Sequence, residues 1–147
     1  MATVKYPAEL TASALLRRLK GEIAPDQWRS LESGGEGLVI SRHNTETLLS
    51  MRGAVISEDF PIDSASVEAL EALLEEYLDR YMSDKPEGHK WIIISSLYLC
   101  FIARKPMHPI DIVGIRTAQE GGKTVYYCPA KTSGKGDICS FCVCRFA

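Results

Sequence analysis

A chain of 147 residues with a formal charge of −2 has the size of one ordinary globular domain. A domain of this size buries roughly two thirds of the surface that its unfolded chain exposes, so a core does not depend on a bound metal. The net charge is too small to imply a particular partner, and the longest apolar run has thirteen residues where a membrane span needs about twenty. The composition therefore predicts one domain over residues 1–147 and no membrane partner.

The first half of the chain predicts helices that each place one apolar face on a core. Leucine and isoleucine recur at helical intervals within residues 8–23. Pro25 is expected in the first turn of a short helix that carries Trp28. Asn44 is a candidate N-cap for a helix that runs toward Gly53.

A longer helix is predicted after Pro61, with Asp63 or Ser64 as its cap and a wide apolar stripe through residues 67–81. The acidic residues of this helix fall mainly on the opposite side and are assigned to a solvated face: Glu68, Glu71, Glu75, Glu76 and Asp79. Without a histidine at ligand spacing, these carboxylates do not indicate a metal or acid-base site.

The apolar run of residues 91–103 predicts a central core helix, because its length exceeds that of a strand and Pro106 follows it. Cys100 lies inside this run, where a cysteine most often behaves as a small buried hydrophobe. The functional alternative for Cys100 is an extra ligand or a reactive thiol beneath a metal site.

The residues after Pro106 change in character to β-branched and aromatic. Residues 110–116 and 123–128, with the glycine-containing segment 119–122 between them, predict a β-hairpin whose second strand ends at Cys128. The predicted fold class is therefore mainly α, with a helical body over about 8–105 and a C-terminal β-hairpin and cysteine-rich metal-binding tail over about 108–147.

Four of the five cysteines lie in the last twenty residues, at Cys128, Cys139, Cys142 and Cys144. Zinc binds four thiolates at about 2.3 Å each, and the Cys139-x-x-Cys142 spacing supplies two of them from one turn. In an extended chain Cys144 stands about 6.6 Å from Cys142, so a bend between them is needed to bring both sulfurs to one metal. We expect a reducing cytoplasm, because no secretory leader precedes the chain and an odd number of cysteines does not suit a disulfide framework.

His108 lies between Pro106 and Pro109 and is the best candidate for an additional or replacement ligand, or for an acid-base group near the thiolates. A structural histidine is the simpler interpretation. His43 and His89 border predicted helices and are interpreted as ordinary cap or surface residues.

These residues support a first hypothesis and two alternatives. The first is a noncatalytic protein with a structural four-cysteine zinc site, which serves as an adaptor or in assembly with an unidentified protein partner, because a saturated site leaves no open position for a substrate. The alternative is an iron-sulfur or thiol redox protein that uses the same cysteines. A second alternative is nucleic-acid binding through the cations of the tail, which are few: Lys123, Lys131, Lys135 and Arg145. No nucleophile elbow or zinc-protease motif is present. The sequence does not decide whether the protein has an enzyme activity.

Three segments, residues 105–109, 127–129 and 139–145, resemble an uncharacterised archaeal family found mostly in methanogens. The resemblance runs from the core helix to the end and more loosely through the earlier helices. It implies a cytoplasmic protein of an anaerobic cell. Such a setting makes an iron-sulfur cluster more plausible than the spacing alone does, while zinc stays preferred.

Overall fold

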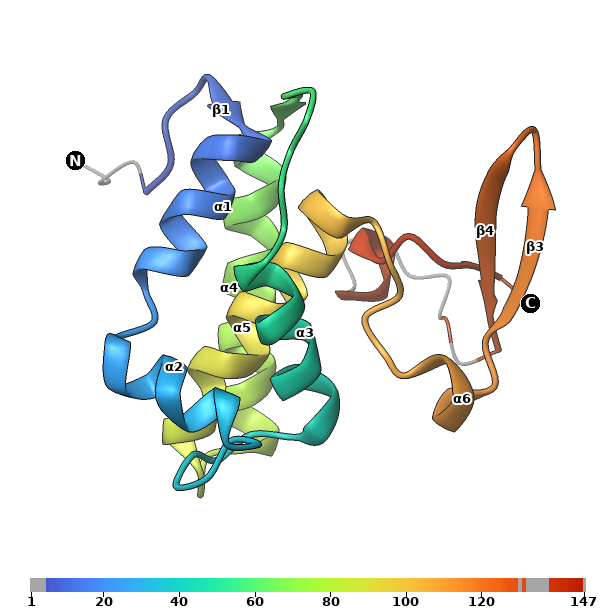
Figure 1. The fold of residues 1–147 in the computed structure, drawn as a ribbon. Coiled ribbons are helices and arrows are strands. Elements are labelled where there is room, and N and C mark those ends of the chain that lie inside the picture. The colour runs from blue at the N-terminus through green and yellow to red at the C-terminus, as the bar shows by residue number, and fades with distance from the viewer. Residues whose placement is uncertain (1–4, 130, 132–137, 147) are drawn as a thin grey trace.

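The computed structural model describes residues 5–129, 131 and 138–146, and most of these are helical (Figure 1). The α-helices are α1 (Ala12–Gly21), α2 (Pro25–Glu32), α3 (Arg42–Arg52), α4 (Ser64–Tyr81), α5 (His89–Leu97) and α6 (Ile110–Val113). The other helical turns are η1 (Pro86–Gly88), η2 (Tyr98–Ala103) and η3 (Ile138–Phe141). The strands are β1 (Leu10–Thr11), β2 (Pro61–Ile62), β3 (Arg116–Glu120), β4 (Lys123–Cys128) and β5 (Arg145–Phe146). The mainly α class is confirmed, and within the described ranges no helix has the length and apolar character needed to cross a membrane.

The helices of the body begin at residues with N-terminal signals. Thr11 and Ser41 cap α1 and α3, and each side-chain oxygen accepts a hydrogen bond from the backbone N–H three residues later, at 3.2 and 3.1 Å. Pro25 opens α2 and Asp63 stands at the N-cap of α4, as predicted. The prediction of Asn44 as a cap was wrong, because the serine hydroxyl three residues earlier satisfies the free N–H of Asn44.

Helix α5 lies at the centre of the body (Figure 1). Its Trp91, Ile94 and Leu97 are no more than 2% exposed. They belong to one cluster with fully buried leucines of the surrounding helices, including Leu15, Leu19, Leu31, Leu48 and Leu70. Full burial stabilises the fold by about 1.5–3 kcal/mol for each such side chain, so this cluster accounts for a core without any ligand.

The core helix ends in η2, which is a π-helical turn of six residues. The Lys105 N–H donates to the Leu99 carbonyl at 3.1 Å, and Arg104 has a left-handed backbone with φ of 55°. The Arg104 guanidinium donates a hydrogen bond to the Cys100 carbonyl at 2.9 Å. This bond satisfies a backbone acceptor near the end of the helix. The predicted core helix is confirmed, although its wide final turn was not foreseen.

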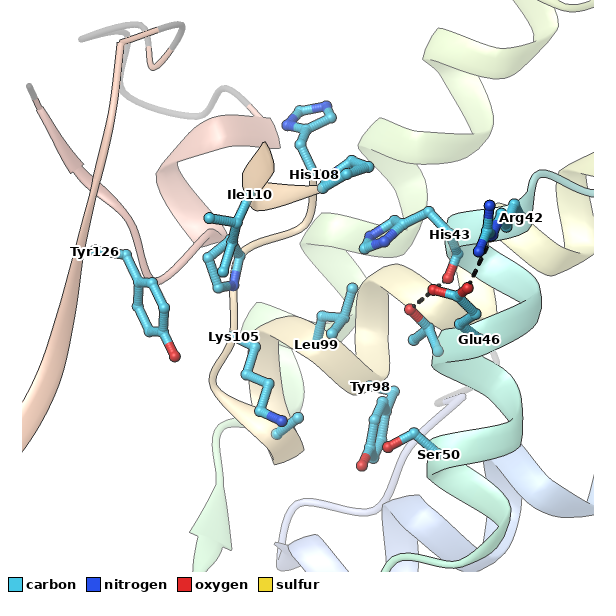
Figure 2. Close-up of a pocket in the computed structure, with 14 residues that line it drawn as sticks. Arg42, His43, Glu46, Ser50, Tyr98, Leu99, Lys105, His108, Ile110 and Tyr126 are labelled. Atoms are coloured by element: carbon cyan, nitrogen blue, oxygen red, sulfur yellow. Dashed lines mark hydrogen bonds and ion pairs between the residues drawn. The ribbon is translucent and has the colours of Figure 1, made fainter. Parts of the chain in front are cut away.

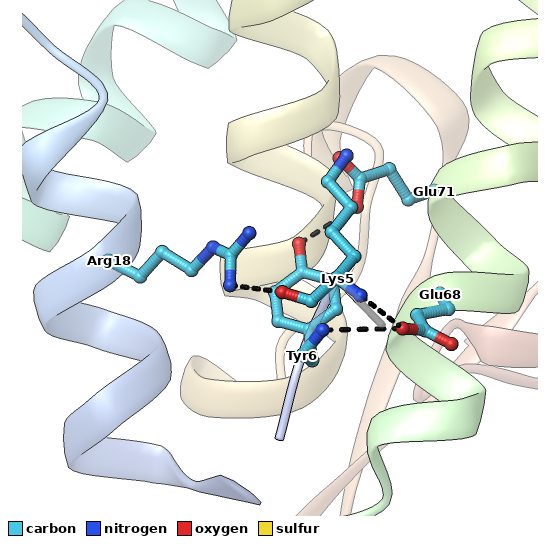
Figure 3. Close-up of polar contacts among 5 residues, drawn as sticks. All are labelled: Lys5, Tyr6, Arg18, Glu68 and Glu71. Atoms are coloured by element: carbon cyan, nitrogen blue, oxygen red, sulfur yellow. Dashed lines mark hydrogen bonds and ion pairs between the residues drawn. The ribbon is translucent and has the colours of Figure 1, made fainter. Parts of the chain in front are cut away.

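Helix α4 buries one carboxylate that the sequence placed on a solvated face. Glu71 is 8% exposed; its carboxylate accepts a hydrogen bond from the Tyr6 hydroxyl at 2.8 Å and pairs with the Lys5 ammonium (Figure 3). The Arg18 guanidinium lies 4.2 Å from the centre of the Tyr6 ring. Burial, together with Glu71, raises the pKa of Tyr6 above its ordinary value. The assignment of Glu71 to solvent was wrong, because the N-terminal segment covers this part of α4.

Strands β3 and β4 form the predicted antiparallel hairpin, paired from Arg116 and Tyr127 to Glu120 and Lys123. Gly121 and Gly122 connect them, each with positive φ, as a two-residue hairpin turn requires.

The prediction that the first strand of the hairpin begins at residue 110 was wrong. Pro109 stands at the N-cap of α6, and Gly114 ends that helix in a left-handed conformation with φ of 80°. These two residues confine residues 110–113 to a single helical turn before the sheet starts.

Strand β5 adds a parallel partner to the other side of β4, with Tyr127 opposite Arg145 and Cys128 opposite Phe146. The sequence predicted a hairpin of two strands, and the third strand was not foreseen. The three-stranded sheet lies to one side of the helical body (Figure 1).

Candidate functional site

A cavity of about 560 Å³ is lined by both the helical body and the C-terminal tail. All the predicted site residues line it: Cys128, Cys139, Cys142, Cys144 and His108. The body contributes apolar side chains of α4 and α5 and polar residues at the start of α3, among them Leu74, Leu78, Ile92, His43 and Asn44. We call this space the thiol cavity.

Three elements of the tail position the four thiols. Cys128 is the last residue of β4, and Cys144 immediately precedes β5, which pairs with β4. Cys139 lies in η3, and its carbonyl accepts a hydrogen bond from the Cys142 N–H at 3.2 Å, so the Cys-x-x-Cys segment forms a tight turn. The chain then bends at residues 142 and 143. The predicted bend between these two cysteines is therefore confirmed.

The thiols differ in their exposure to solvent. Cys128 and Cys144 are 5% and 3% exposed and share a small hydrophobic cluster with Ile115, whereas Cys139 and Cys142 are half-buried. Burial and the neighbouring Cys142 raise the pKa of Cys144 to about 12. Cys100 is fully buried in the main core, and burial with a contribution from Cys142 raises its pKa to about 12. The interpretation of Cys100 as a small buried hydrophobe is confirmed.

Among the residues that the structure describes, no group of three or more His, Cys, Asp or Glu side chains is arranged to hold a metal ion. The predicted ligands thus line one cavity without forming a coordination polyhedron. Ligation by Cys128, Cys139, Cys142 and Cys144, with or without His108, stays a prediction.

His43 is the residue near this site that sequence reasoning missed. It lies in the first turn of α3, is half-buried and lines the thiol cavity together with the exposed His108. Its Nε2 is 3.0 Å from the Met107 carbonyl oxygen. Since a carbonyl only accepts, this contact assigns the proton to Nε2 and leaves Nδ1 of a neutral ring as an acceptor or ligand atom. No local sequence signal connects residues 43 and 107, because only tertiary packing brings them together.

Lys131 forms hydrogen bonds within the tail, next to the thiols. Its ammonium donates to the backbone carbonyl of Cys142 at 3.1 Å and to that of Cys144. This contact places a positive charge next to two of the candidate ligands.

The other tail cations that the structure describes make different contacts from Lys131. Arg145 pairs with Glu120 at 3.3 Å, and Lys123 is exposed at the start of β4. Lys135 lies outside the described residues. The cations that the structure describes are thus distributed over the sheet, and one of them contacts the thiol segment.

A family model described as an uncharacterized protein conserved in archaea (DUF2115) matches residues 39–146. The chain belongs to this family, which confirms the resemblance to an archaeal family. The matched range begins before α3 and ends in β5, so it includes both walls of the thiol cavity.

Among curated proteins, the chain is similar to UPF0305 protein MJ0646 of Methanocaldococcus jannaschii, with 29% identity over 110 residues. This alignment covers 68% of the chain and 64% of the relative's length. No solved structure matches the chain.

Proposed function

We propose that this protein is a noncatalytic zinc-binding protein whose ion is held by Cys128, Cys139, Cys142 and Cys144. The observation that carries the proposal is the position of these four residues on one cavity, although they come from the end of β4, from η3 and from the segment between η3 and β5. The ion would fix the tail against the helical body and present that surface to a protein partner as an adaptor or assembly site.

The chemistry of the donors supports zinc. Four thiols are a soft ligand set, and zinc accepts four thiolates without a further geometric demand. Binding exchanges the thiol protons for the metal, so the affinity should increase with pH. Four thiolates around a divalent ion leave a net negative charge, which the Lys131 ammonium beside Cys142 and Cys144 partly offsets.

A saturated four-cysteine site has no open position for substrate, so this proposal assigns the protein no reaction. His108 and His43 line the same cavity and are the replacement ligands if one cysteine does not bind. The proposal also places the protein in a reducing compartment such as the cytoplasm, because the thiols must stay reduced to bind zinc.

The second candidate is an iron-sulfur or thiol redox function of the same residues, and the packing of Cys142 against the cluster that holds Cys144 favours it. A small disulfide could oxidise this pair. One thiolate would attack the reagent and release a thiol, and the second would displace another thiol as the protein disulfide forms.

The deciding experiment is elemental analysis, with a visible spectrum, of protein purified without oxygen. We expect one zinc per chain and no colour. Iron with sulfide and visible absorbance would establish the second candidate instead, and protein with neither metal would contradict both metal proposals.

The variant Cys142→Ser should lose the ion and melt at a lower temperature. Cys100→Ala is the matched control, because Cys100 is also a cysteine but lies in the main core, and this variant should retain the zinc. Equal metal content in wild type and Cys142→Ser would show that this residue is not a ligand.

A further inference from the structure

A second cavity of about 600 Å³ shares part of its lining with the thiol cavity, and Figure 2 shows the residues that line it. Residues of α3, η2, the loop before α6 and strand β4 line it, and none of them is a cysteine. His43 and His108 belong to both linings. We call this space the basic cavity, and cavities of about 300–1,000 Å³ are the usual size of small-molecule sites.

One buried hydroxyl opens onto the basic cavity without a partner. Tyr98 lines the cavity and is only 7% exposed, so its ring is packed in the protein. Within the part of the chain that the structure describes, the Tyr98 hydroxyl has no hydrogen-bond partner. Its oxygen keeps some contact with solvent, because it is not one of the fully buried polar atoms. A hydroxyl in this position has lost most of its water contacts and gains from a ligand atom that accepts its proton.

Further donors gather near Tyr98. Figure 2 shows Lys105, Tyr98 and Ser50 at one end of the cavity, with Tyr126 facing it from β4. In the described ranges, the Lys105 ammonium pairs with no carboxylate, and the Ser50 and Tyr126 hydroxyls make no hydrogen bond. These groups offer an ammonium and hydroxyl protons to the same space.

The carboxylate that lines the cavity does not cancel this charge. Glu46 accepts a hydrogen bond from Arg42 at 3.0 Å, and this pair lies one helical turn apart on α3. The remaining charged side chain of the lining is Lys105, so the cavity has a net positive character even with both histidines neutral.

The π-helical turn explains how these groups meet. Tyr98 and Leu99 stand at the start of η2, and Lys105 follows its left-handed end at Arg104. Arg104 donates to the Cys100 carbonyl at the end of this turn, and the next residue, Lys105, lines the cavity (Figure 2). Widened turns of this kind occur often at functional sites.

We infer that the basic cavity binds a small molecule that carries an oxyanion group, either a phosphate or a carboxylate. The oxyanion accepts hydrogen bonds from the Lys105 ammonium and the Tyr98 and Ser50 hydroxyls. The apolar part of the ligand packs on Leu99 and Pro106, which line the same space. This site shares no cysteine with the proposed zinc site and does not depend on the metal.

The test is a titration of the full chain, at low salt, with phenyl phosphate, benzoate and inorganic phosphate, followed by calorimetry and by NMR. We expect saturable binding of phenyl phosphate or benzoate that weakens with salt. Binding of phenyl phosphate alone would identify a phosphate ligand, and binding of benzoate alone would identify a carboxylate. Inorganic phosphate should bind more weakly than phenyl phosphate because it lacks the apolar group.

Two conservative variants test whether the ligand binds in the basic cavity. Lys105→Gln and Tyr98→Phe should each weaken binding about tenfold, since each removes one donor to a charged acceptor. Lys123→Gln and Tyr81→Phe are the matched controls, because both residues are exposed and lie outside the cavity lining, and they should leave binding unchanged.

Three results would overturn the inference. They are no binding of any probe up to about 10 mM, equal binding by Lys105→Gln and wild type, and equal loss of affinity in the control variants. Binding that persists after chelation of zinc would separate this site from the zinc proposal.

Discussion

The helical body and the C-terminal sheet bury their side chains in different ways. The body packs aliphatic and aromatic residues of several helices into one large cluster around α5. The sheet and tail share a small cluster of Ile115, Cys128 and Cys144. Thiols therefore occupy positions in the tail where a larger core would place leucine or isoleucine. The difference teaches that burial of apolar side chains accounts for the residues of the body, whereas the thiols of the tail fit the proposed metal site, which stays a prediction.

The largest expected effect is in the body. Leu48→Ala removes a fully buried side chain from the main cluster and should lower the free energy of unfolding by about 2–5 kcal/mol. Urea denaturation measures this loss. Val55→Ala, at a position 89% exposed, is the control and should change stability by less than about 0.5 kcal/mol. Similar stability of Leu48→Ala and wild type would contradict the assignment of the core.

A smaller, local effect is expected in the sheet. Ile115→Ala removes the aliphatic member of the second cluster and should destabilise the sheet by about 2 kcal/mol, as judged from buried isoleucine truncations. Hydrogen exchange should become faster at the amides of β4 and β5, while α5 keeps its protection. Thr117→Ala on the exposed side of β3 is the control. An equal acceleration in α5 would mean that the two regions unfold together.

The hydrogen bond between Tyr6 and Glu71 should contribute about 1.5–3 kcal/mol to the free energy of unfolding, the usual range for a bond to a charged group. Because the pKa of Tyr6 is raised in the folded state, the phenol keeps its proton there more tightly than in the unfolded chain. This stabilisation is complete below the unfolded pKa of about 10 and is lost as the pH increases through the folded value.

The measurement is the difference in unfolding free energy between wild type and Tyr6→Phe. The variant should be less stable near pH 8, and the difference should shrink above about pH 10, because the Tyr6 phenol of the unfolded chain begins to lose its proton there. Tyr81→Phe, which removes a hydroxyl at a position 67% exposed, is the control. A difference that stays constant up to about pH 11 would contradict the role of the Tyr6 proton.

Local signals predicted much of the fold. The proline at the start of α2, the apolar stripe of α4 and the glycine pair between β3 and β4 each act within a few residues, and each element is present. The sequence also predicted the set of four cysteines and His108, all of which line the thiol cavity. Their ligation of a metal stays a prediction.

The errors in the local predictions have a common physical origin. Asn44 was taken for a cap although the Ser41 hydroxyl already serves that helix, and residues 110–113 form a helical turn because Pro109 and Gly114 bound them. In both places two signals compete over a few residues, and small differences in backbone geometry decide between them.

By itself, the sequence determined the periodic elements, the apolar core helix and the concentration of thiols at the end of the chain. Only the tertiary structure decided that Tyr6 buries the Glu71 carboxylate, that His43 meets the Met107 carbonyl, and that β5 returns to β4. The first two contacts join residues 65 and 64 positions apart. Periodicity and capping carry no information over such separations, because those contacts form only when whole helices pack against one another.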